Sequence, residues 1–305
     1  LQGYTLSKQI GFDFMARDGL IIQAYLSLPP HAQLKHEVDV SEEDQPFAQL
    51  GMIPVKPQKM VLLLHGGPRK RDLFGLDKYN AFLTNRGYAV LQVNFRGSIG
   101  FGKTFANAGN GEWSRKMHTD LLDAVDFVIA KGIANRSEVA IMGGSFGGYA
   151  ALVGLTFTPD TFACGVDIAG PSNLVSLMDK VPPYWTDRHL HIQMMGGDSA
   201  TESGRQELLA RSPLFHAGKV KTRLLYGIAL SFDFLKLLYS EQLVEALKKH
   251  SIPNTYVLYP DEGHGIRRHP NSLALFGHLE KFLHECLGGD YQPFTNGQYN
   301  ESAIV

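Results

Sequence analysis

The sequence is poor in cysteine, with only Cys164 and Cys286 among 305 residues. Two cysteines exclude a framework of several disulfides and a zinc site built from thiolates. One bridge between them stays possible. Both lie in apolar segments, however, where a buried free thiol is the usual state, so we expect two free thiols. We also expect no metal and no other cofactor.

Long hydrophobic runs and an excess of one charge are also missing. No apolar run reaches the roughly 18 residues that a membrane span needs. Twenty-nine basic and 30 acidic residues give a formal net charge of −1, so no long-range field draws the chain to nucleic acid or to an anionic membrane. We therefore expect neither as a partner. No signal peptide is visible, which favours the cytoplasm, but the chain starts with Leu1, so a secreted or periplasmic location stays open.

Alternating strand and helix patterns fill most of the chain. Short apolar runs predict strands at 60–64, 88–93, 139–142, 162–169, 223–228 and 255–260. Helical spacing predicts helices at 76–86, 121–129 (opened by Thr119 and Asp120), from 146 onward, 203–211, 237–250 and 272–286. Asp18-Gly19, between runs 10–16 and 20–28, predicts an N-terminal β-hairpin. This order favours an α/β fold: a mostly parallel, twisted sheet with helices on both faces.

The segment Gly143-Gly144-Ser145-Phe146-Gly147 fits the G-x-S-x-G pattern. It follows a predicted strand and opens an apolar helix, which is the context of a nucleophile elbow. The serine of such a turn has strained backbone angles, so its neighbours need small side chains. We therefore predict that Ser145 is a nucleophile and that the backbone N–H of Phe146 is one oxyanion donor.

A histidine is needed to accept the serine proton, and His264 is our candidate. It follows the predicted strand 255–260 and precedes the last helix, so it lies in a loop at the edge where α/β sheets bind ligands. The acid that orients the histidine should follow the strand 223–228. Asp233 is the only carboxylate of that loop, although an aspartate at a helix start is also a common N-cap.

The second oxyanion donor should lie in the loop after the strand 60–64, which reads His65-Gly66-Gly67-Pro68. Its glycines allow the backbone to approach a substrate oxygen closely, and we predict that the N–H of Gly67 is the donor. His65 is expected to be a structural hydrogen-bonding residue and not the base.

Four motifs together resemble the catalytic domain of the prolyl oligopeptidase family of serine peptidases, with the acylaminoacyl-peptidase-like branch as the nearest match. They occupy residues 65–68, 94–102, 143–149 and 259–265, and the resemblance extends from about residue 8 to 287. It implies an α/β-hydrolase domain over 1–289. Within the chain, the polar residues 31–58 carry little periodicity and predict a surface insertion, and the polar, aperiodic residues 290–305 predict a C-terminal tail. The resemblance also implies an N-terminal β-propeller that this chain does not contain.

The resemblance assigns roles residue by residue. Ser145 matches the nucleophile and His264 the base, while Gly67 and Phe146 match the oxyanion donors. Arg96 resembles a structural arginine of the family. Two aromatic residues resemble walls of an apolar substrate pocket, and they are Tyr149 and Trp185.

The acid loop departs from the family pattern of Gly-x-Asn-Asp-Pro-Arg. An ungapped comparison puts Phe232 at the acid position, with Asp233 one residue later. The leading hypothesis is a serine peptidase that hydrolyses short or N-acylated peptides. Two alternatives stay open: a carboxylesterase that uses the same elbow on a small ester, and a catalytically impaired hydrolase domain.

Overall fold

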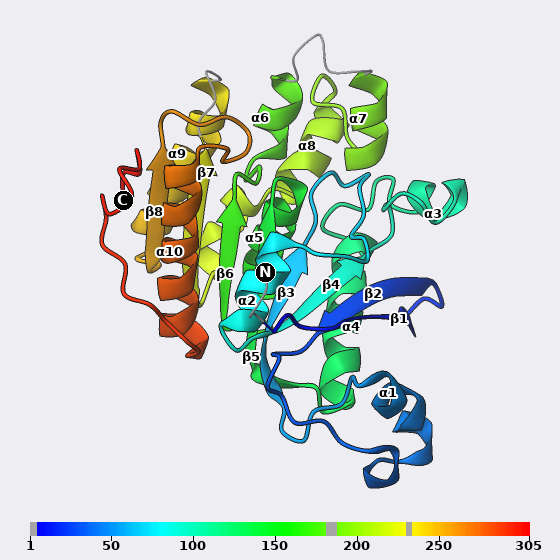
Figure 1. Ribbon diagram of the computed structural model, residues 1–305. Coiled ribbons are helices and arrows are strands. Elements are labelled where there is room, and N and C mark those ends of the chain that lie inside the picture. The colour runs from blue at the N-terminus through cyan, green and yellow to red at the C-terminus, as the bar shows by residue number, and fades with distance from the viewer. Residues whose placement is uncertain (1–4, 181–187, 230–233) are drawn as a thin grey trace.

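The computed structural model describes residues 5–180, 188–229 and 234–305. Within these ranges, eight strands form one sheet in the order β1-β2-β4-β3-β5-β6-β7-β8 (Figure 1). The first two strands are antiparallel additions, and the others are parallel to one another. The strands are β1 Gln9–Met15, β2 Ile21–Ser27, β3 Gln58–Leu64, β4 Ala89–Asn94, β5 Ala134–Gly144, β6 Cys164–Ile168, β7 Arg223–Ala229 and β8 Asn254–Tyr259. The predicted α/β class and mostly parallel sheet are confirmed.

Helices cover both faces of the sheet because the parallel strands are apolar on both faces. In β3, Met60, Leu62 and Leu64 belong to one buried cluster, while Val61 and Leu63 belong to the other. The first cluster includes residues of α4 and α5, and the second includes residues of α2 and α10. Successive side chains of a strand point to opposite faces, so an unbroken apolar run serves both layers.

The helices connect the strands in the expected order, with additions that the sequence patterns did not indicate. The α-helices are α1 Gln45–Leu50, α2 Lys78–Asn85, α3 Lys103–Asn107, α4 Lys116–Ala130, α5 Phe146–Phe157, α6 Leu174–Asp179, α7 Arg188–Met195, α8 Glu202–Ala210, α9 Phe234–Lys249 and α10 His269–Leu287. The 3-10 helices are η1 Glu37–Asp39, η2 Glu42–Asp44 and η3 Pro213–Lys219. The short helices α1, α3, α6 and α7 were not predicted, because five to eight residues carry too little periodicity.

The N-terminal hairpin is fixed to the sheet edge by a buried arginine. Arg96 is 3% exposed and donates to both Asp120 and Asp18, with Nη2–Oδ1 and Nη1–Oδ2 distances of 2.7 and 2.8 Å. Asp18 is the turn residue that identified the hairpin. Asp120 lies inside α4, because this helix begins four residues earlier, at Lys116. The prediction that Thr119 and Asp120 open this helix is wrong, because the Asp120 carboxylate binds Arg96 instead of the helix N–H groups.

The segment 31–58 contains η1, η2 and α1. Met52 and Ile53 anchor it in the core, where they are at most 2% exposed. In its middle, Glu43 and Asp44 pair with Lys131 at the end of α4, at N–O distances of 3.0 and 2.6 Å. The segment is therefore fixed at both an apolar and a charged contact, on the side of the sheet remote from the C-terminal ends of the parallel strands (Figure 1).

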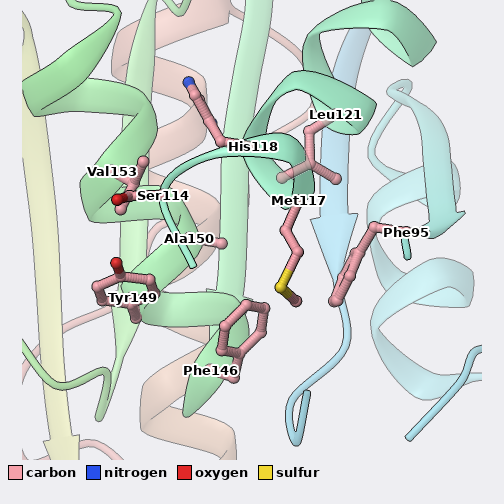
Figure 2. Close-up of a pocket in the computed structure, with 9 residues that line it drawn as sticks. All are labelled: Phe95, Ser114, Met117, His118, Leu121, Phe146, Tyr149, Ala150 and Val153. Carbon is pink, nitrogen blue, oxygen red and sulfur yellow. The ribbon is translucent and has the colours of Figure 1, made fainter. Parts of the chain in front are cut away.

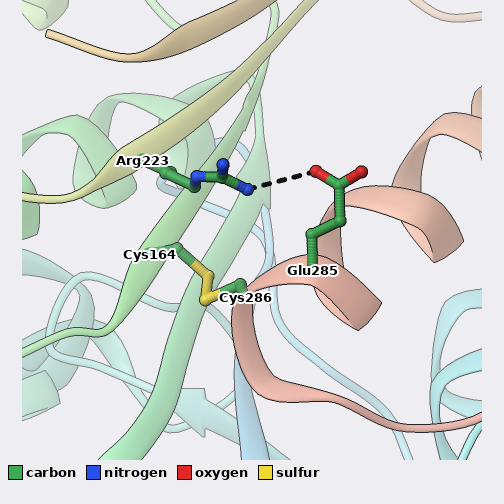
Figure 3. The surroundings of a disulfide bond; sticks show 4 residues. All are labelled: Cys164, Arg223, Glu285 and Cys286. Carbon is green, nitrogen blue, oxygen red and sulfur yellow. Dashed lines mark hydrogen bonds and ion pairs between the residues drawn. A yellow bond between two sulfur atoms is a disulfide. The ribbon is translucent and has the colours of Figure 1, made fainter.

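The two cysteines form a disulfide, which corrects the expectation of free thiols. Cys164 begins β6 and Cys286 lies in the last turn of α10, with an S–S distance of 2.05 Å and a Cα–Cα distance of 6.5 Å. Figure 3 shows the bond beside the ion pair of Arg223 and Glu285. Apolar surroundings indicated burial correctly for Cys164, which is 0% exposed, whereas Cys286 is only partly buried. Because 122 residues separate the partners, only the fold brings them together. In the described ranges, no helix has both the length and the apolar character of a membrane span.

Candidate active site

Ser145 lies at the sharp turn between β5 and α5. Its backbone angles are φ 57° and ψ −120°, a conformation that residues other than glycine rarely adopt. Its N–H donates to the carbonyl oxygen of Ile168 in the neighbouring strand at 2.9 Å. The glycines are needed for space: a Cβ on Gly147 would be 2.4 Å from the carbonyl oxygen of Leu64. The close approach of β3 to the first turn of α5 therefore requires this motif.

His264 comes to the serine from the loop between β8 and α10. Its Nε2 lies 3.1 Å from Ser145 Oγ, across 119 residues of sequence. The imidazole is exposed, and Ser145 is partly exposed. A hydroxyl and an imidazole at this distance can exchange a proton, which is the geometry of a base that activates a nucleophile.

The loop after β3 passes beside the nucleophile. A Cβ on Gly66 would be 3.4 Å from Ser145 Cβ, so no more than a normal contact separates them. Gly67 has φ +121°, and a Cβ there would be 2.7 Å from the N of Arg69. This backbone conformation needs glycine. Phe146 begins α5 directly after the serine, so its N–H is one of the free donors of the helix N-terminus.

His65 supports this loop and does not face the serine as a base. Its Nδ1 lies 2.8 Å from the carbonyl oxygen of Gly66, its Nε2 3.0 Å from Ser98 Oγ, and its ring stacks on Phe95 with centroids 4.4 Å apart. Burial lowers its pKa to about 4, so the ring is neutral near pH 7. A carbonyl oxygen only accepts, so Nδ1 carries the proton. These contacts agree with the structural role expected for His65.

The two carboxylates on the His264 loop are bound elsewhere. Glu262 accepts from the backbone N–H groups of Arg267 and Arg268 at 3.0 and 2.9 Å. Asp261 accepts from Arg268 Nη1 at 2.7 Å and from Asn271 Nδ2 at 2.9 Å. Asp233, our candidate acid, lies outside the described residues.

Tyr149 is in the first turns of α5, but its ring is only 1% exposed and its hydroxyl donates to the carbonyl oxygen of Arg211 at 3.0 Å. It lines an apolar cavity of about 10 Å³ behind the elbow. Figure 2 shows Phe95, Met117 and Phe146 around the same space. Such a volume holds about one water molecule, so a substrate side chain does not fit in this arrangement. Trp185, the other expected pocket wall, lies outside the described residues.

A larger cavity lies on the other side of the elbow. It has a volume of about 270 Å³ and includes Gly66, Gly144 and Ile168 in its lining, together with Asp72 and Tyr79. Burial raises the pKa of Asp72 to about 7. Asp72 and Tyr79 were not predicted as site residues. Asp72 follows the oxyanion loop in a segment without periodicity or a motif, and Tyr79 lies in the predicted helix 76–86, whose spacing gives no sign of a site.

A second buried carboxyl lies under the elbow. Asp167, at the end of β6, is 0% exposed, and its Oδ1 accepts from the N–H of Gly170 at 2.8 Å. A Cβ on Gly148 would be 1.9 Å from this oxygen. Burial raises the pKa of Asp167 to about 8, so the carboxyl is largely protonated at pH 7. A neutral group in this position adds no negative charge near the donors of the α5 N-terminus.

Comparison with known proteins gives consistent results. A profile described as "Prolyl oligopeptidase family" matches residues 75–290. The chain is 60% identical to "Dipeptidyl peptidase family member 6" of Caenorhabditis elegans, over all of this chain and 41% of that protein. It is 48% identical to "Dipeptidyl aminopeptidase BIII" of Pseudoxanthomonas mexicana, over 96% of this chain and 40% of that protein. The chain thus spans about two fifths of these relatives.

Solved structures show the same fold. A puromycin-hydrolyzing peptidase of Mycobacterium tuberculosis superposes with a TM-score of 0.81, at 24% identity, over 96% of this chain and 41% of that chain. An acylaminoacyl peptidase in complex with a chloromethyl ketone superposes with a TM-score of 0.76, at 22% identity, over 97% of this chain and 44% of that chain.

Proposed function

The chain belongs to the prolyl oligopeptidase family of serine peptidases, and we propose that it hydrolyses peptide bonds of short peptides through an acyl-enzyme on Ser145. The observation that carries the proposal is the 3.1 Å contact between His264 Nε2 and Ser145 Oγ. It joins a residue of an α/β elbow to a histidine at the C-terminal end of the last parallel strand. Two groups this far apart in sequence meet here in the geometry that the reaction needs.

In the proposed mechanism His264 accepts the Ser145 proton while Oγ attacks the substrate carbonyl carbon. The N–H groups of Phe146 and Gly67 stabilise the oxyanion of the tetrahedral intermediate. His264 then gives the proton to the leaving amine, and the peptide bond breaks. A water molecule repeats the sequence on the acyl-enzyme and releases the acid product. Asp233 is the proposed acid that orients the imidazole, since Asp261 and Glu262 on its own loop are bound elsewhere.

The proposed substrate class is short peptides with a free N-terminus, from which a dipeptide is released. The relatives of 60% and 48% identity carry dipeptidyl peptidase names, whereas acylamino-acid-releasing enzymes of Oryza sativa and Arabidopsis thaliana are 28% and 29% identical. The 270 Å³ cavity with Asp72 beside the elbow supports this proposal, because a carboxyl group suits an amine. N-acylated peptides are the second candidate class. Trp185 and Tyr149 remain proposed wall residues of the substrate pocket. For Tyr149 this role requires the cavity of about 10 Å³ beside it to widen when substrate binds.

The test uses a fluorophosphonate probe, which labels an activated serine, and three substrates. Wild-type protein should be labelled and should cleave a dipeptidyl anilide faster than an acetyl-aminoacyl anilide. Ser145→Ala should abolish both labelling and turnover. Ser137→Ala is the matched control, because Ser137 is exposed on the same strand and remote from the elbow.

Other outcomes separate the alternatives. Labelling that survives Ser145→Ala contradicts the proposed nucleophile. Turnover of a p-nitrophenyl ester without cleavage of either anilide favours the carboxylesterase, and no turnover of any substrate favours the impaired domain. For the acid, Asp233→Asn should lower kcat by about 10⁴-fold. Asp261→Asn is the control, because this carboxylate is bound to Arg268 and Asn271, and it should lower kcat far less. Equal losses of kcat in the two variants would contradict the role of Asp233.

The partner that we propose within the whole protein is an N-terminal β-propeller. The relatives are about two and a half times as long as the region matched here, and a propeller over the sheet edge would restrict access to the exposed His264. Peptide length selection would then depend on both parts. Limited proteolysis of the full-length protein should release a fragment that corresponds to this chain and a second protease-resistant fragment from the propeller. A full-length protein that yields no second resistant fragment would contradict the proposal.

The disulfide favours an oxidising compartment over the cytoplasm. Structural disulfides persist in secreted and periplasmic proteins, whereas cytosolic reductants keep most thiols reduced. We therefore propose the secretory route or the periplasm. The check is to block free thiols at lysis and to measure the mass of the Cys164 and Cys286 peptides without reduction. Alkylation of both cysteines would show that they are free thiols in the cell, and this result would favour the cytoplasm.

A further inference from the structure

The C-terminal segment 288–305 returns along the molecule to the end that carries the active site. In Figure 1 the red chain leaves the lower end of α10 and comes to lie beside β8. Phe294 packs against Gly277 and the His278 ring of α10, with ring centroids 5.1 Å apart. The chain then turns at 295–301, where the Glu301 carboxylate accepts from the N–H groups of Gly297 and Tyr299. These contacts direct residues 302–305 toward the loop that holds His264.

The His264 loop is closed by a buried carboxylate. Glu262 is 5% exposed and accepts from the backbone N–H groups of Arg267 and Arg268. These donors lie on the far side of His264 in sequence, so one side chain joins the two ends of the loop 263–266. The donors also mark the N-terminus of α10, where a negative charge is stabilised.

Asn271 connects this closed loop to the C-terminal segment. It is 1% exposed, and its Nδ2 donates to Glu262 Oε1 at 2.8 Å and to Asp261 Oδ1 at 2.9 Å. Its Oδ1 accepts from the N–H of Ser302 at 2.9 Å. The Ser302 hydroxyl also donates to Asp261 Oδ1. This hydroxyl is the main reason why the pKa of Asp261 is held below its usual range. Ser302 thus closes a network that begins at the His264 loop.

A second attachment lies two residues later. The N–H of Ile304 donates to the carbonyl oxygen of Leu258, and the N–H of Leu258 donates to that of Ile304, both at 2.8 Å. Leu258 is near the end of β8, six residues before His264. The Ile304 side chain is 57% exposed, so this contact depends on the backbone and not on apolar burial.

We propose that Ser302 and Ile304 are positioning residues that hold the His264 loop at its distance from Ser145. The inference rests on the proposed function, since it assigns these residues to the same base. Four hydrogen bonds hold the loop from the outside: two join Ile304 to Leu258 of β8, and two join Ser302 to Asn271 and Asp261. Glu262 closes the loop from within. His264 is exposed, so the path of its loop backbone contributes to where the ring lies. Catalysis is sensitive to this: a shift of about 1 Å can cost about 100-fold in rate.

The test compares Ser302→Ala/Ile304→Pro with the wild type in the full chain. The serine variant removes the bond to Asp261, and proline removes the Ile304 N–H that Leu258 accepts. We expect kcat to fall about ten-fold with little change in KM, and fluorophosphonate labelling of Ser145 to slow by the same factor. Hydrogen exchange of the amides at 262–268 should become faster while the exchange of β5 and α5 stays unchanged.

Two matched controls separate positioning from general packing. Ile304→Ala keeps the backbone N–H, and Gln298→Ala changes a residue whose Oε1 accepts from the Thr295 N–H within the turn at 295–301. Both should retain wild-type kcat. Equal losses in Gln298→Ala, or unchanged exchange at 262–268 in the double variant, would overturn the inference. The exchange measurement needs no turnover, so it decides the inference even if the wild-type serine is not labelled, a result that would refute the proposed function alone.

Discussion

Asp167 is a buried carboxyl group whose raised pKa makes the stability of the protein depend on pH. It lies under the elbow with Oδ1 bound to the Gly170 N–H, while no hydrogen-bond partner for Oδ2 occurs in the described ranges. Burial raises its pKa from 3.8 to about 8. Between these values the folded protein keeps a proton that the unfolded chain has lost. The unfolded state therefore binds fewer protons, and the stability falls as the pH rises from about 4 to 8.

Asp167→Asn should remove this pH dependence, because an amide has the same shape and does not ionise. We expect the melting temperature of the wild type to fall between pH 5 and pH 8 by several degrees more than that of the variant. The exposed Asp13→Asn is a control that should follow the wild type. Identical pH profiles for wild type and Asp167→Asn would show that the carboxyl is ionised in the folded protein.

At the scale of elements, the Arg96 cluster joins the N-terminal hairpin, the loop after β4 and helix α4. Arg96→Gln would leave Asp120, which is 0% exposed, without its charged partner. The cost of breaking a buried pair is about 3–5 kcal/mol of unfolding free energy. Arg136→Gln breaks an exposed pair with Asp126 and should cost about 0–1 kcal/mol. Urea denaturation measures both, and equal losses would contradict a structural role for Arg96.

Helices and strands were predictable from the sequence where the hydrophobic pattern of their own residues determines them. The strands that became β3 to β8 are short apolar runs, and burial on both faces explains the runs of β3, β4 and β6. Helix α4 shows the limit: its helical spacing was visible, but its start was misplaced because Asp120 had a long-range partner. The helices α6 and α7 are short and depend on packing against neighbours, so their sequences carried no sufficient period.

At the scale of the whole molecule, the disulfide connects the start of β6 to the end of α10 and closes a loop of 122 residues. Such a link restricts the unfolded chain, and its reduction should cost about 2–4 kcal/mol. The denaturation midpoint of the wild type should therefore fall on addition of a reductant, whereas Cys164→Ala/Cys286→Ala should not respond to it. An equal response of both proteins would mean that the cysteines are not paired.

The sequence alone determined the α/β class, the elbow at Ser145 and the loop that carries His264. These features depend on local causes: an apolar run, a turn that needs glycine, and a strand that ends beside a polar loop. Only the tertiary structure decided that His264 Nε2 reaches Ser145 Oγ, that Cys164 pairs with Cys286, and that the C-terminal segment reaches the loop of His264. Each of these contacts joins residues more than 30 positions apart, and sequence periodicity carries no record of which distant segments meet.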